Sequence, residues 1–231
     1  MEGERTDSSH GQHQGVKEKY LAKVLPIIRH RGFSHLRIDE LARSMDISKA
    51  TFYKHFSSKE EVIEGVVEMV VSYLKEMARL LGDDSSPYLE RFQHTFGQSV
   101  LIASYLSEAF MLDLKQIFPP LWERVRGAQQ ERQRRVQQFY EQGIAAGVFQ
   151  PINPALVVLQ DELILPGILD PVFLMEHDLT LKAALYDYYE LQKYQWLAPE
   201  VSQQLNDAPV KEYIDMMARK ISLGMRSDLV L

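Results

Sequence analysis

The amino-acid sequence predicts an all-α protein, and three observations support that fold class. Apolar residues recur every three to four positions through most of the chain, as they do in amphipathic helices. No segment shows sustained two-residue alternation or an Asn-Gly hairpin signal, which argues against a sheet. Hydrophobic residues make up 45% of the 231 positions, enough to form a folded core. We expect a small N-terminal helical domain followed by a larger one.

Residues 1–15 are polar and rich in Gly, Ser and His, so we expect them to form a flexible tail. His10 and His13 in this tail make a poor metal site, because two histidines in a flexible segment cannot fix a coordination geometry. No segment has the apolar length of a signal peptide or a membrane span. The absence of cysteine excludes disulfides and thiolate metal sites and suits the reducing cytoplasm, where we expect the protein to act without a cofactor.

Three helices are expected within residues 16–62, the predicted N-terminal domain. The first begins at Val16 and ends at Gly32, a typical C-cap residue. Pro26 lies inside it, where a proline typically costs about 3 kcal/mol. The other two helices are short, and their expected ranges are Ile38–Met45 and Ser48–His55.

The larger domain, residues 63–231, is expected to contain the remaining helices. A fourth helix opens at Ser57 or Ser58, each followed three residues later by a glutamate that completes a capping box, and it stops at Gly82. The prolines at 166 and 171 predict a kink or two separate pieces in one of the later segments. The later segments are expected at Tyr88–Phe118, Leu121–Ala146, Ala155–Glu176, Leu181–Leu197 and Val210–Met225.

The charge is distributed unevenly along the chain. The net charge is −6, yet residues 1–59 carry eleven Lys/Arg against seven Asp/Glu, while residues 60–231 carry fifteen against twenty-five. A local basic surface is sufficient to attract phosphates, and an acidic remainder discourages binding through the wrong face. A difference in net charge of this size between two parts of a chain also arises by chance, so charge alone does not decide the function.

The segment from Leu36 to Lys59 has the pattern of a helix-turn-helix. Ser48 is placed to cap the second of its two short helices. The outward side chains of that helix are all hydrogen-bond donors, and none is acidic: they are Lys49, Thr51, Tyr53, Lys54 and His55. Ala50 lies between them and is small enough to allow close approach to DNA. Such a surface fits the major groove, where donors meet phosphates and base edges. A solvated amphipathic helix remains the alternative on spacing alone.

A longer motif resembles the DNA-binding signature of the tetracycline-repressor (TetR) family. The matching runs are Gly32-Phe33, Ile38–Ala42, Ile47–Phe56 and Ser58–Val62. The resemblance implies a homodimeric regulator, most often a repressor, that binds double-stranded DNA at a pseudo-palindromic operator and senses a ligand in a helical core. It implies phosphate contacts by Ser48, Tyr53 and Lys59. It implies base contacts by Arg37, Lys49, Ala50, Thr51, Lys54 and His55.

Three features depart from the family pattern, the first being Pro26 inside the first helix, and one further segment extends the likeness. Asp46 replaces the usual turn glycine, and Asp tolerates a left-handed backbone better than most residues. Leu36-Arg37 replaces the usual Ser or Thr before the second helix, which weakens the cap and places a cation beside the DNA. Gln142–Phe149 resembles the helix end that precedes the family's dimerising helices, so we expect dimerisation within Asn153–Leu197.

The larger domain is rich in aromatic residues, and an apolar cavity lined by some of them is the expected ligand site. The candidate lining residues are Phe92, Phe96, Tyr105, Phe110, Asp113, Trp122, Tyr140 and Asp161. For any single aromatic, plain core packing is the alternative. Asp113, Asp161 and Glu162 lie among apolar neighbours in the sequence. If one of these carboxylates is buried, it could bind a cationic effector; the alternatives are an exposed helix face or an ion pair with Lys or Arg. A hydrophobic effector is the other expectation.

Other function classes are less well supported. The cluster Arg132, Arg134 and Arg135 is either a second nucleic-acid patch or, as we expect, the solvated face of a long helix. The chain has no HExxH, GxxxxGK[ST] or GxSxG motif, so we expect no enzyme. The remaining alternative is a DNA-bound factor that acts through a protein partner without a small-molecule inducer. The sequence names neither the operator nor the effector.

Overall fold

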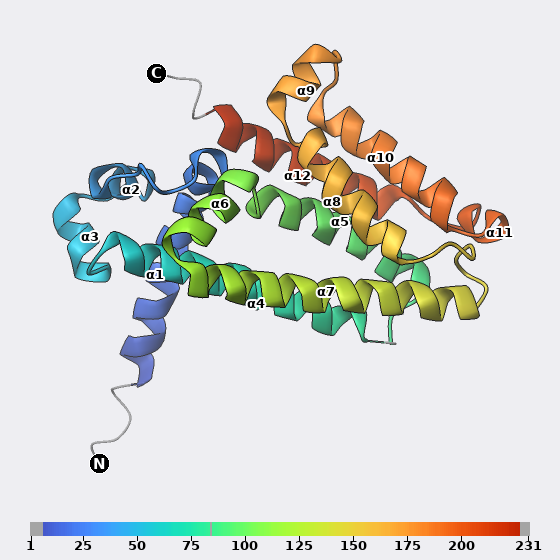
Figure 1. The fold of residues 1–231 in the computed structure, drawn as a ribbon, viewed down its shortest axis with the longest axis horizontal. Helices are drawn as coiled ribbons and strands as arrows, with labels where there is room; N and C mark the ends of the chain where they lie inside the picture. Colours follow the sequence, from blue (N-terminus) through green and yellow to red (C-terminus); the bar gives the residue numbers. More distant parts are fainter. Residues whose placement is uncertain (1–6, 84, 227–231) are drawn as a thin grey trace. The chain divides into compact units, whose positions relative to one another are not determined.

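A computed structural model describes the backbone of residues 7–83 and 85–226, and over these residues the fold is all-α, as predicted (Figure 1). The only β pairing in this described part is an isolated bridge between Phe149 and Leu197. The helices are α1 (Asp7–Arg31), α2 (Ile38–Ser44), α3 (Lys49–His55), α4 (Lys59–Leu81), α5 (Tyr88–Tyr105), α6 (Glu108–Ile117), α7 (Pro119–Ala145), α8 (Ala155–Ile168), α9 (Pro171–Glu176), α10 (Leu181–Trp196), α11 (Pro199–Ser202) and α12 (Ala208–Arg226). None of the described helices is both long enough and apolar enough to cross a membrane.

The chain divides into two compact units. The first comprises residues 1–73 and 108–125, so it contains α1 to α3, most of α4, α6 and the start of α7. The second comprises residues 74–107 and 126–231 and contains the end of α4, α5, the rest of α7 and α8 to α12. The segment 108–125 therefore packs with the helix-turn-helix, although it is distant from it in sequence.

Helices α1 to α4 in the first unit pack around the apolar residues that the helical period places on one side. Leu41, Ala42 and Phe52 are buried, as the sequence predicted, while Ile38 and Ile47 are half-buried. The turn between α2 and α3 contains Asp46 with φ 58°, which confirms the expected left-handed residue. Helices this short are marginal alone, so their burial against α1 and α4 holds them in place.

The first helix is longer than predicted. It begins at Asp7 rather than Val16, so residues 7–15, expected in the flexible tail, are helical; residues 1–6 and the side chains of His10 and His13 lie outside the described part. Pro26 lies inside the helix, which continues past it. The helix ends at Arg31, and Gly32 follows with φ +69° and an N–H that donates to Ile28 O at 2.8 Å. The predicted C-cap at Gly32 is therefore confirmed.

The start of α4 is capped by two serines and a glutamate. Ser58 Oγ accepts from Glu61 N at 3.2 Å, while Glu61 Oε2 accepts from Ser57 N at 2.7 Å and from Ser57 Oγ at 2.8 Å. The two serines that the sequence left as alternatives thus share the cap. The ion pair with Lys17 at 2.8 Å, followed by the Ser57 hydrogen bonds, lowers the pKa of Glu61 to about 2.

Several helix boundaries differ from the predicted ones. The expected single helix Tyr88–Phe118 is two helices, α5 and α6, separated at Leu106 and Ser107. Helix α7 starts at Pro119, because a proline is tolerated in the first turn, whose N–H groups have no intrahelical partner. Of the two alternatives predicted after residue 155, a kink or two pieces, the structure has two pieces: α8 ends at Ile168, and Asp170 Oδ1 accepts from Val172 N at the start of α9.

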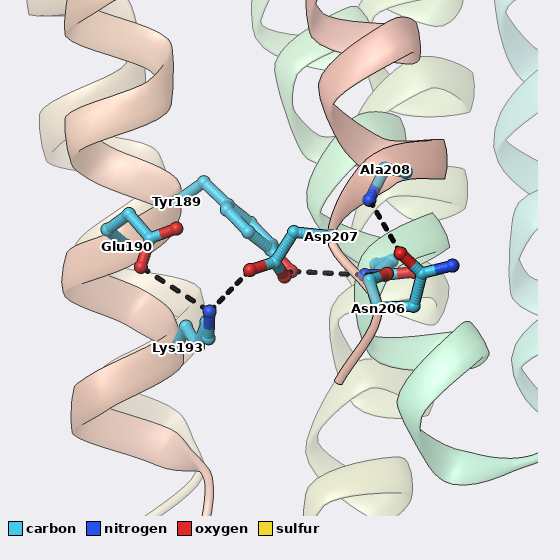
Figure 2. Close-up of polar contacts among 7 residues, drawn as sticks. Tyr189, Glu190, Lys193, Asn206, Asp207 and Ala208 are labelled. Carbon is cyan, nitrogen blue, oxygen red and sulfur yellow. Dashed lines mark hydrogen bonds and ion pairs between the residues drawn. The ribbon is translucent and has the colours of Figure 1, made fainter. Parts of the chain in front are cut away.

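The second unit has an aromatic core and a buried polar network between α10 and the start of α12 (Figure 2). Lys193 Nζ binds Asp207 Oδ2 at 2.5 Å and Glu190 Oε2 at 3.5 Å, and Tyr189 Oη donates to Asp207 Oδ1 at 2.7 Å. Burial is the largest single influence and lowers the pKa of Lys193, but the hydrogen bonds and charges of Asp207 and Glu190 together outweigh it and raise the pKa. The network fixes α12 against α10.

Candidate nucleic-acid interface and ligand pocket

Ser48 and Thr51 define the start of α3. Ser48 Oγ accepts from Thr51 N at 3.1 Å and lies 2.9 Å from Thr51 Oγ1, which confirms Ser48 as the N-cap. Capping satisfies one of the donors that a helix start leaves open. Thr51 is half-buried, and its hydroxyl is engaged with Ser48 in this arrangement.

The outer face of α3 is exposed and free of acidic side chains. Lys49, Ala50, Tyr53 and Lys54 are exposed, with Tyr53 50% accessible. His55 differs from the prediction: its ring is half-buried and packs edge-on against Tyr20, with the ring centroids 5.1 Å apart. The predicted donor surface is therefore present from Ser48 to Lys54, while His55 also serves the packing of α3 on α1.

Lys49 forms a bridge between the two short helices. Its Nζ lies 3.0 Å from Asp39 Oδ1 on α2, and the hydrogen bond to Asp39 raises the pKa of Lys49. Both side chains are more than half exposed, so solvent and salt weaken the pair. Lys49 can therefore exchange Asp39 for a phosphate or a base edge at small cost.

Arg37 and Lys59 flank the helix pair. Arg37 is exposed and occupies the N-cap position of α2 without a side-chain cap; instead Glu40 Oε2 accepts from Arg37 N at 2.8 Å. Lys59, which the family resemblance assigns to a phosphate, is half-buried, and its Nζ donates to Ser34 O at 3.0 Å and Leu36 O at 2.9 Å. Through these two hydrogen bonds Lys59 stabilises the loop before α2.

The same loop is held from its other side by Asp113 on α6. Asp113 Oδ2 accepts from Phe33 N at 2.5 Å and from Ser34 N at 2.7 Å. The Asp113 carboxylate is buried, and the two backbone N–H groups satisfy it without a cationic ligand. The expectation that Asp113 lines the effector pocket is therefore not supported. Phe33 also packs against Phe110 and Phe118, with centroid distances of 6.1 and 5.8 Å.

The eight residues predicted to line a ligand pocket do not gather at one site. Phe110, Asp113 and Trp122 belong to the first unit, and the other five belong to the second. Phe92, Phe96 and Tyr140 are fully buried and pack against other aromatic rings of the core, the alternative that the sequence left open; Tyr105 is half-buried. Asp161 alone among the eight lines the pocket described next.

A pocket of about 270 Å³ lies among α5, α7 and α8 in the second unit. Its polar lining residues are Ser99, Gln129, Arg132, Gln133, Asp161 and Glu162. Its apolar lining residues are Ile102, Ala103, Leu106, Val136, Val158, Leu165 and Pro166. A mainly apolar wall with a few convergent polar groups is the usual composition of a small-molecule site.

An arginine and an aspartate form the polar side of this pocket, and Arg132 is buried whereas Asp161 is half-buried. Arg132 is 7% exposed, and one of its Nη atoms donates to Ser99 Oγ at 2.9 Å. Asp161 Oδ1 accepts from Tyr188 Oη at 2.8 Å and from Gln192 Nε2 at 2.6 Å. Burial raises the pKa of Asp161, and the hydrogen bonds from Ser99, Tyr188 and Gln192 together with the charge of Arg132 oppose that rise.

The sequence missed Arg132 as a pocket residue. We expected it on a solvated face with Arg134 and Arg135, but it is buried, whereas its two neighbours pair with Glu131. Glu162 is exposed and accepts from Gln133, so it is not a buried carboxylate. The helical period could have indicated that Arg132 is buried, because Arg132 lies one turn before Val136 on the buried side of α7.

Comparison with known proteins identifies the helix-turn-helix segment. Residues 26–66 match the family model described as bacterial regulatory proteins, tetR family. The chain carries a TetR-family domain. The match covers the end of α1, all of α2 and α3, and the start of α4, the elements that hold the donor surface.

Two bacterial relatives resemble the same end of the chain. The HTH-type transcriptional regulator YvaF of Bacillus subtilis is 31% identical over 71 residues, which are 31% of this chain and 37% of YvaF. The biofilm operon icaADBC negative transcriptional regulator IcaR of Staphylococcus aureus is 27% identical over 73 residues, 32% of this chain and 39% of IcaR. The aligned stretch thus spans less than two fifths of the length of either relative.

Solved structures extend the fold likeness to most of the chain. A protein of Saccharomonospora viridis, described as a transcriptional regulator and solved in complex with choline, has a TM-score of 0.60 at 14% identity, covering 80% of this chain and 99% of that protein. A TetR transcriptional regulator from Chloroflexus aurantiacus has a TM-score of 0.57 at 17% identity, covering 81% and 99%. At these identities the likeness establishes the TetR-like arrangement of an N-terminal helix-turn-helix and a larger helical domain.

Proposed function

We propose that the protein is a sequence-specific DNA-binding transcriptional repressor that acts in the cytoplasm and catalyses no reaction. The observation that carries this proposal is the exposed, donor-rich outer face of α3, set on a helix that Ser48 caps and that α1, α2 and α4 hold in place. In a TetR-family domain this face enters the major groove. We take residues 16–62 as the DNA-binding domain and residues 63–231 as the effector-binding and dimerisation domain.

Within that domain we assign two kinds of contact. Ser48, Tyr53 and Lys59 contact phosphates, with Lys59 acting also through the loop that it holds. Base contacts fall to Lys49, Ala50, Thr51 and Lys54, with Arg37 and His55 at the edges of the surface. Phosphate contacts set affinity for any duplex and its salt dependence, whereas base contacts set preference among sequences.

We propose that the functional protein is a homodimer whose two α3 helices enter major grooves about 34–36 Å apart on a pseudo-palindromic operator. The support is a set of large apolar side chains left exposed on α8, α9 and α10: Leu156, Leu159, Leu163, Ile164, Val172, Met175, Leu191 and Tyr194. Three of the four on α8 fall at the i, i+3 and i+7 spacing of one helix face. An exposed apolar face of this kind marks an interaction surface, and a two-fold dimer uses the same patch on both partners.

We further propose that a small molecule in the pocket among α5, α7 and α8 relieves operator binding. The support is the buried Arg132 and the half-buried Asp161 beside an apolar wall. Helix α8 contributes to this pocket and also carries half of the exposed apolar residues of the proposed dimer face, so a ligand that favours one placement of α8 would favour one dimer geometry. The structural relative solved with choline is one whose crystals hold a small molecule.

The test begins with selection of bound duplexes from a random library, followed by measurement of affinity for the selected and a scrambled duplex at several salt concentrations. Tyr53→Phe is expected to weaken binding to both duplexes equally. Lys54→Ala is expected to lower the preference for the selected duplex by about ten- to hundredfold, because a good base contact gives about 1–3 kcal/mol of discrimination. Lys220→Ala, an exposed lysine on α12, serves as the matched control and should change neither quantity.

Two results would decide against parts of the proposal. Retention of full affinity by Tyr53→Phe and Lys54→Ala together would exclude α3 as the DNA-contacting surface. Operator binding that no hydrophobic, anionic or cationic compound alters would instead favour the alternative function, a DNA-bound factor that acts through a protein partner.

A further inference from the structure

Helices α6 and α4 each contribute one charged side chain to the loop between α1 and α2, residues 32–37. Asp113 of α6 accepts from Phe33 N at 2.5 Å and from Ser34 N at 2.7 Å. The Asp113 side chain is buried, so little water competes for its carboxylate. Hydrogen bonds to an ionised acceptor are about twice as strong as neutral ones. Asp113 therefore fixes the first part of the loop.

Lys59 of α4 holds the second part of the same loop. Its Nζ donates to Ser34 O at 3.0 Å and to Leu36 O at 2.9 Å. Leu36 is itself buried, and its N–H donates to Phe33 O at 3.1 Å. The carboxylate thus binds N–H groups of the loop while the ammonium binds its carbonyl oxygens. The loop is left with little freedom to change its backbone conformation.

Helix α6 also fits the loop by shape. The ring of Phe33 is fully buried and packs against Phe110 on α6 and Phe118 just after it. The backbone at Gly32 approaches the Asp113 carboxylate so closely that an added Cβ would lie 2.3 Å from Oδ2. The loop therefore has one well-defined position on α6, although the two segments are distant in sequence.

Arg37 stands at the end of this loop and is exposed on the proposed DNA-contacting surface. Its N–H donates to Glu40 Oε2 at 2.8 Å, and its carbonyl oxygen accepts from Glu40 N at 3.0 Å. With its backbone fixed in this way, Arg37 reaches DNA from a point that the loop sets. A productive contact requires its groups to be held within about 0.5 Å, so a displaced loop would lose a base contact by Arg37.

We propose that Asp113 is a positioning residue for DNA recognition, which contacts no base and sets the base preference of Arg37 by fixing the loop before it. This inference rests on the proposed function and adds to its DNA-binding domain a helix outside residues 16–62. Two other roles for Asp113 predict different results. A purely stabilising role would lower the folded fraction and leave the preference of the folded molecules unchanged. A purely electrostatic role would be shared by any acid on the same helix.

The test is a double-mutant cycle on the full-length protein, with the ratio of affinities for the selected and the scrambled duplex as the readout. The active concentration of each variant is first determined by stoichiometric titration, so that unfolded molecules do not enter the ratio. Arg37→Ala is expected to lower the preference about tenfold in the wild-type background. Asp113→Ala alone should lower it about fivefold, and Arg37→Ala added to it only about twofold more, because most of the contact is already lost. Lys54→Ala, on α3, should have the same effect in both backgrounds.

Two further variants control for charge and for folding. Glu108→Ala is the matched control, because Glu108 is an exposed acid on α6, and neither the preference nor the effect of Arg37→Ala should change. Asp113→Asn keeps an oxygen that can accept from both N–H groups, so it should retain most of the Arg37-dependent preference. If Asp113→Ala does not fold, Lys59→Met replaces it in the cycle. A lost phosphate contact of Lys59 would weaken binding to both duplexes and cancel in the ratio, so a reduced effect of Arg37→Ala still reports on the loop.

Equal effects of Arg37→Ala in the wild-type and Asp113→Ala backgrounds would overturn the inference. Coupling of the same size to Lys54→Ala would overturn it as well, since the loop would then have no particular connection with Arg37. So would an Arg37→Ala variant with unchanged preference, because there would be no contact to position. In each of these results the wild type still prefers the selected duplex and the proposed function stands. A wild type that prefers no duplex would overturn the proposed function and this inference together.

Discussion

Gly32 and Asp113 should be energetically coupled, because the backbone of one fits against the carboxylate of the other. Asp113 Oδ2 accepts from Phe33 N and Ser34 N, the two residues that follow Gly32. A Cβ built at Gly32 would lie 2.3 Å from Asp113 Oδ2 and 3.0 Å from its Cγ, too close for either atom to stay in place. Gly32 also has φ +69°, a region that costs an L-residue about 1–2 kcal/mol.

The magnitudes follow from these contacts. Asp113→Ala leaves two N–H groups without their acceptor, one buried and one partly buried, so unfolding free energy should fall by about 2–4 kcal/mol. Gly32→Ala should cost about 3–6 kcal/mol, because it adds the backbone strain to displacement of the same carboxylate. In the double variant the carboxylate is already gone, so only the strain is added. The double variant should therefore be about 2–4 kcal/mol more stable than the sum of the single losses predicts.

The assay can be confined to the first unit. The protein has two tryptophans, Trp122 in the first unit and Trp196 in the second, so a Trp196→Phe background leaves Trp122 as the reporter. Urea unfolding of the four members of the cycle is followed by fluorescence in that background. Gly127→Ala on α7 is the control, since nothing lies within 4 Å of its built Cβ, and it should lose no stability. Strict additivity, to within about 0.5 kcal/mol, would refute the described contact.

Three further predictions concern other contacts. The pKa of Glu61 is about 2 in the folded protein against an ordinary 4.5, so the stability that the Glu61 carboxylate contributes is present above pH 4.5 and is lost as the pH falls toward 2. The unfolding free energy of Glu61→Gln should therefore fall less steeply than that of the wild type between pH 4.5 and 2. An unchanged dependence of stability on pH would contradict the cap. Lys193→Met should lower unfolding free energy by about 1–3 kcal/mol in urea by leaving Asp207 without its cation, and Asp207→Asn in the same background should restore part of the loss. Leu163→Glu should shift sedimentation toward the monomer, while Leu112→Glu, an exposed leucine on α6, should not; equal behaviour would exclude α8 as the dimer face.

The helix-turn-helix could be predicted from the sequence because its determinants are local. Ser48 caps the helix that begins one residue later, and Asp46 adopts the left-handed turn, each within a few residues of the element that it shapes. The apolar period placed Leu41 and Phe52 in the core correctly. The start of α1 was missed because residues 7–15 carry no apolar stripe, and hydrophobic periodicity was the signal in use.

The pocket could not be predicted, because residues distant in sequence decide it. Arg132 and Arg134 are two positions apart and chemically identical, but only the first meets Ser99 on α5 and is buried. Asp113 and Asp161 both lie in apolar runs, yet one binds backbone N–H groups of the loop after α1 and the other binds Tyr188 on α10. No local pattern distinguishes these outcomes. The break between α5 and α6 is similar, since neither Leu106 nor Ser107 is a typical helix breaker.

The placement of α8 suggests how a small ligand could alter DNA binding. Val158, Asp161 and Leu165 face the pocket, whereas Leu159 and Leu163 on the same helix are exposed. A ligand beside Arg132 and Asp161 contacts the helix through residues adjacent to the proposed dimer face, so it needs no long relay to reach a second subunit. Coupling free energies between such sites are typically about 1–3 kcal/mol, or about 5- to 150-fold in affinity. A coupling of that size would suffice to release a repressor from its operator if the two dimer geometries differ by the same factor in their affinity for the ligand. One measurable quantity therefore links ligand binding to the operator response.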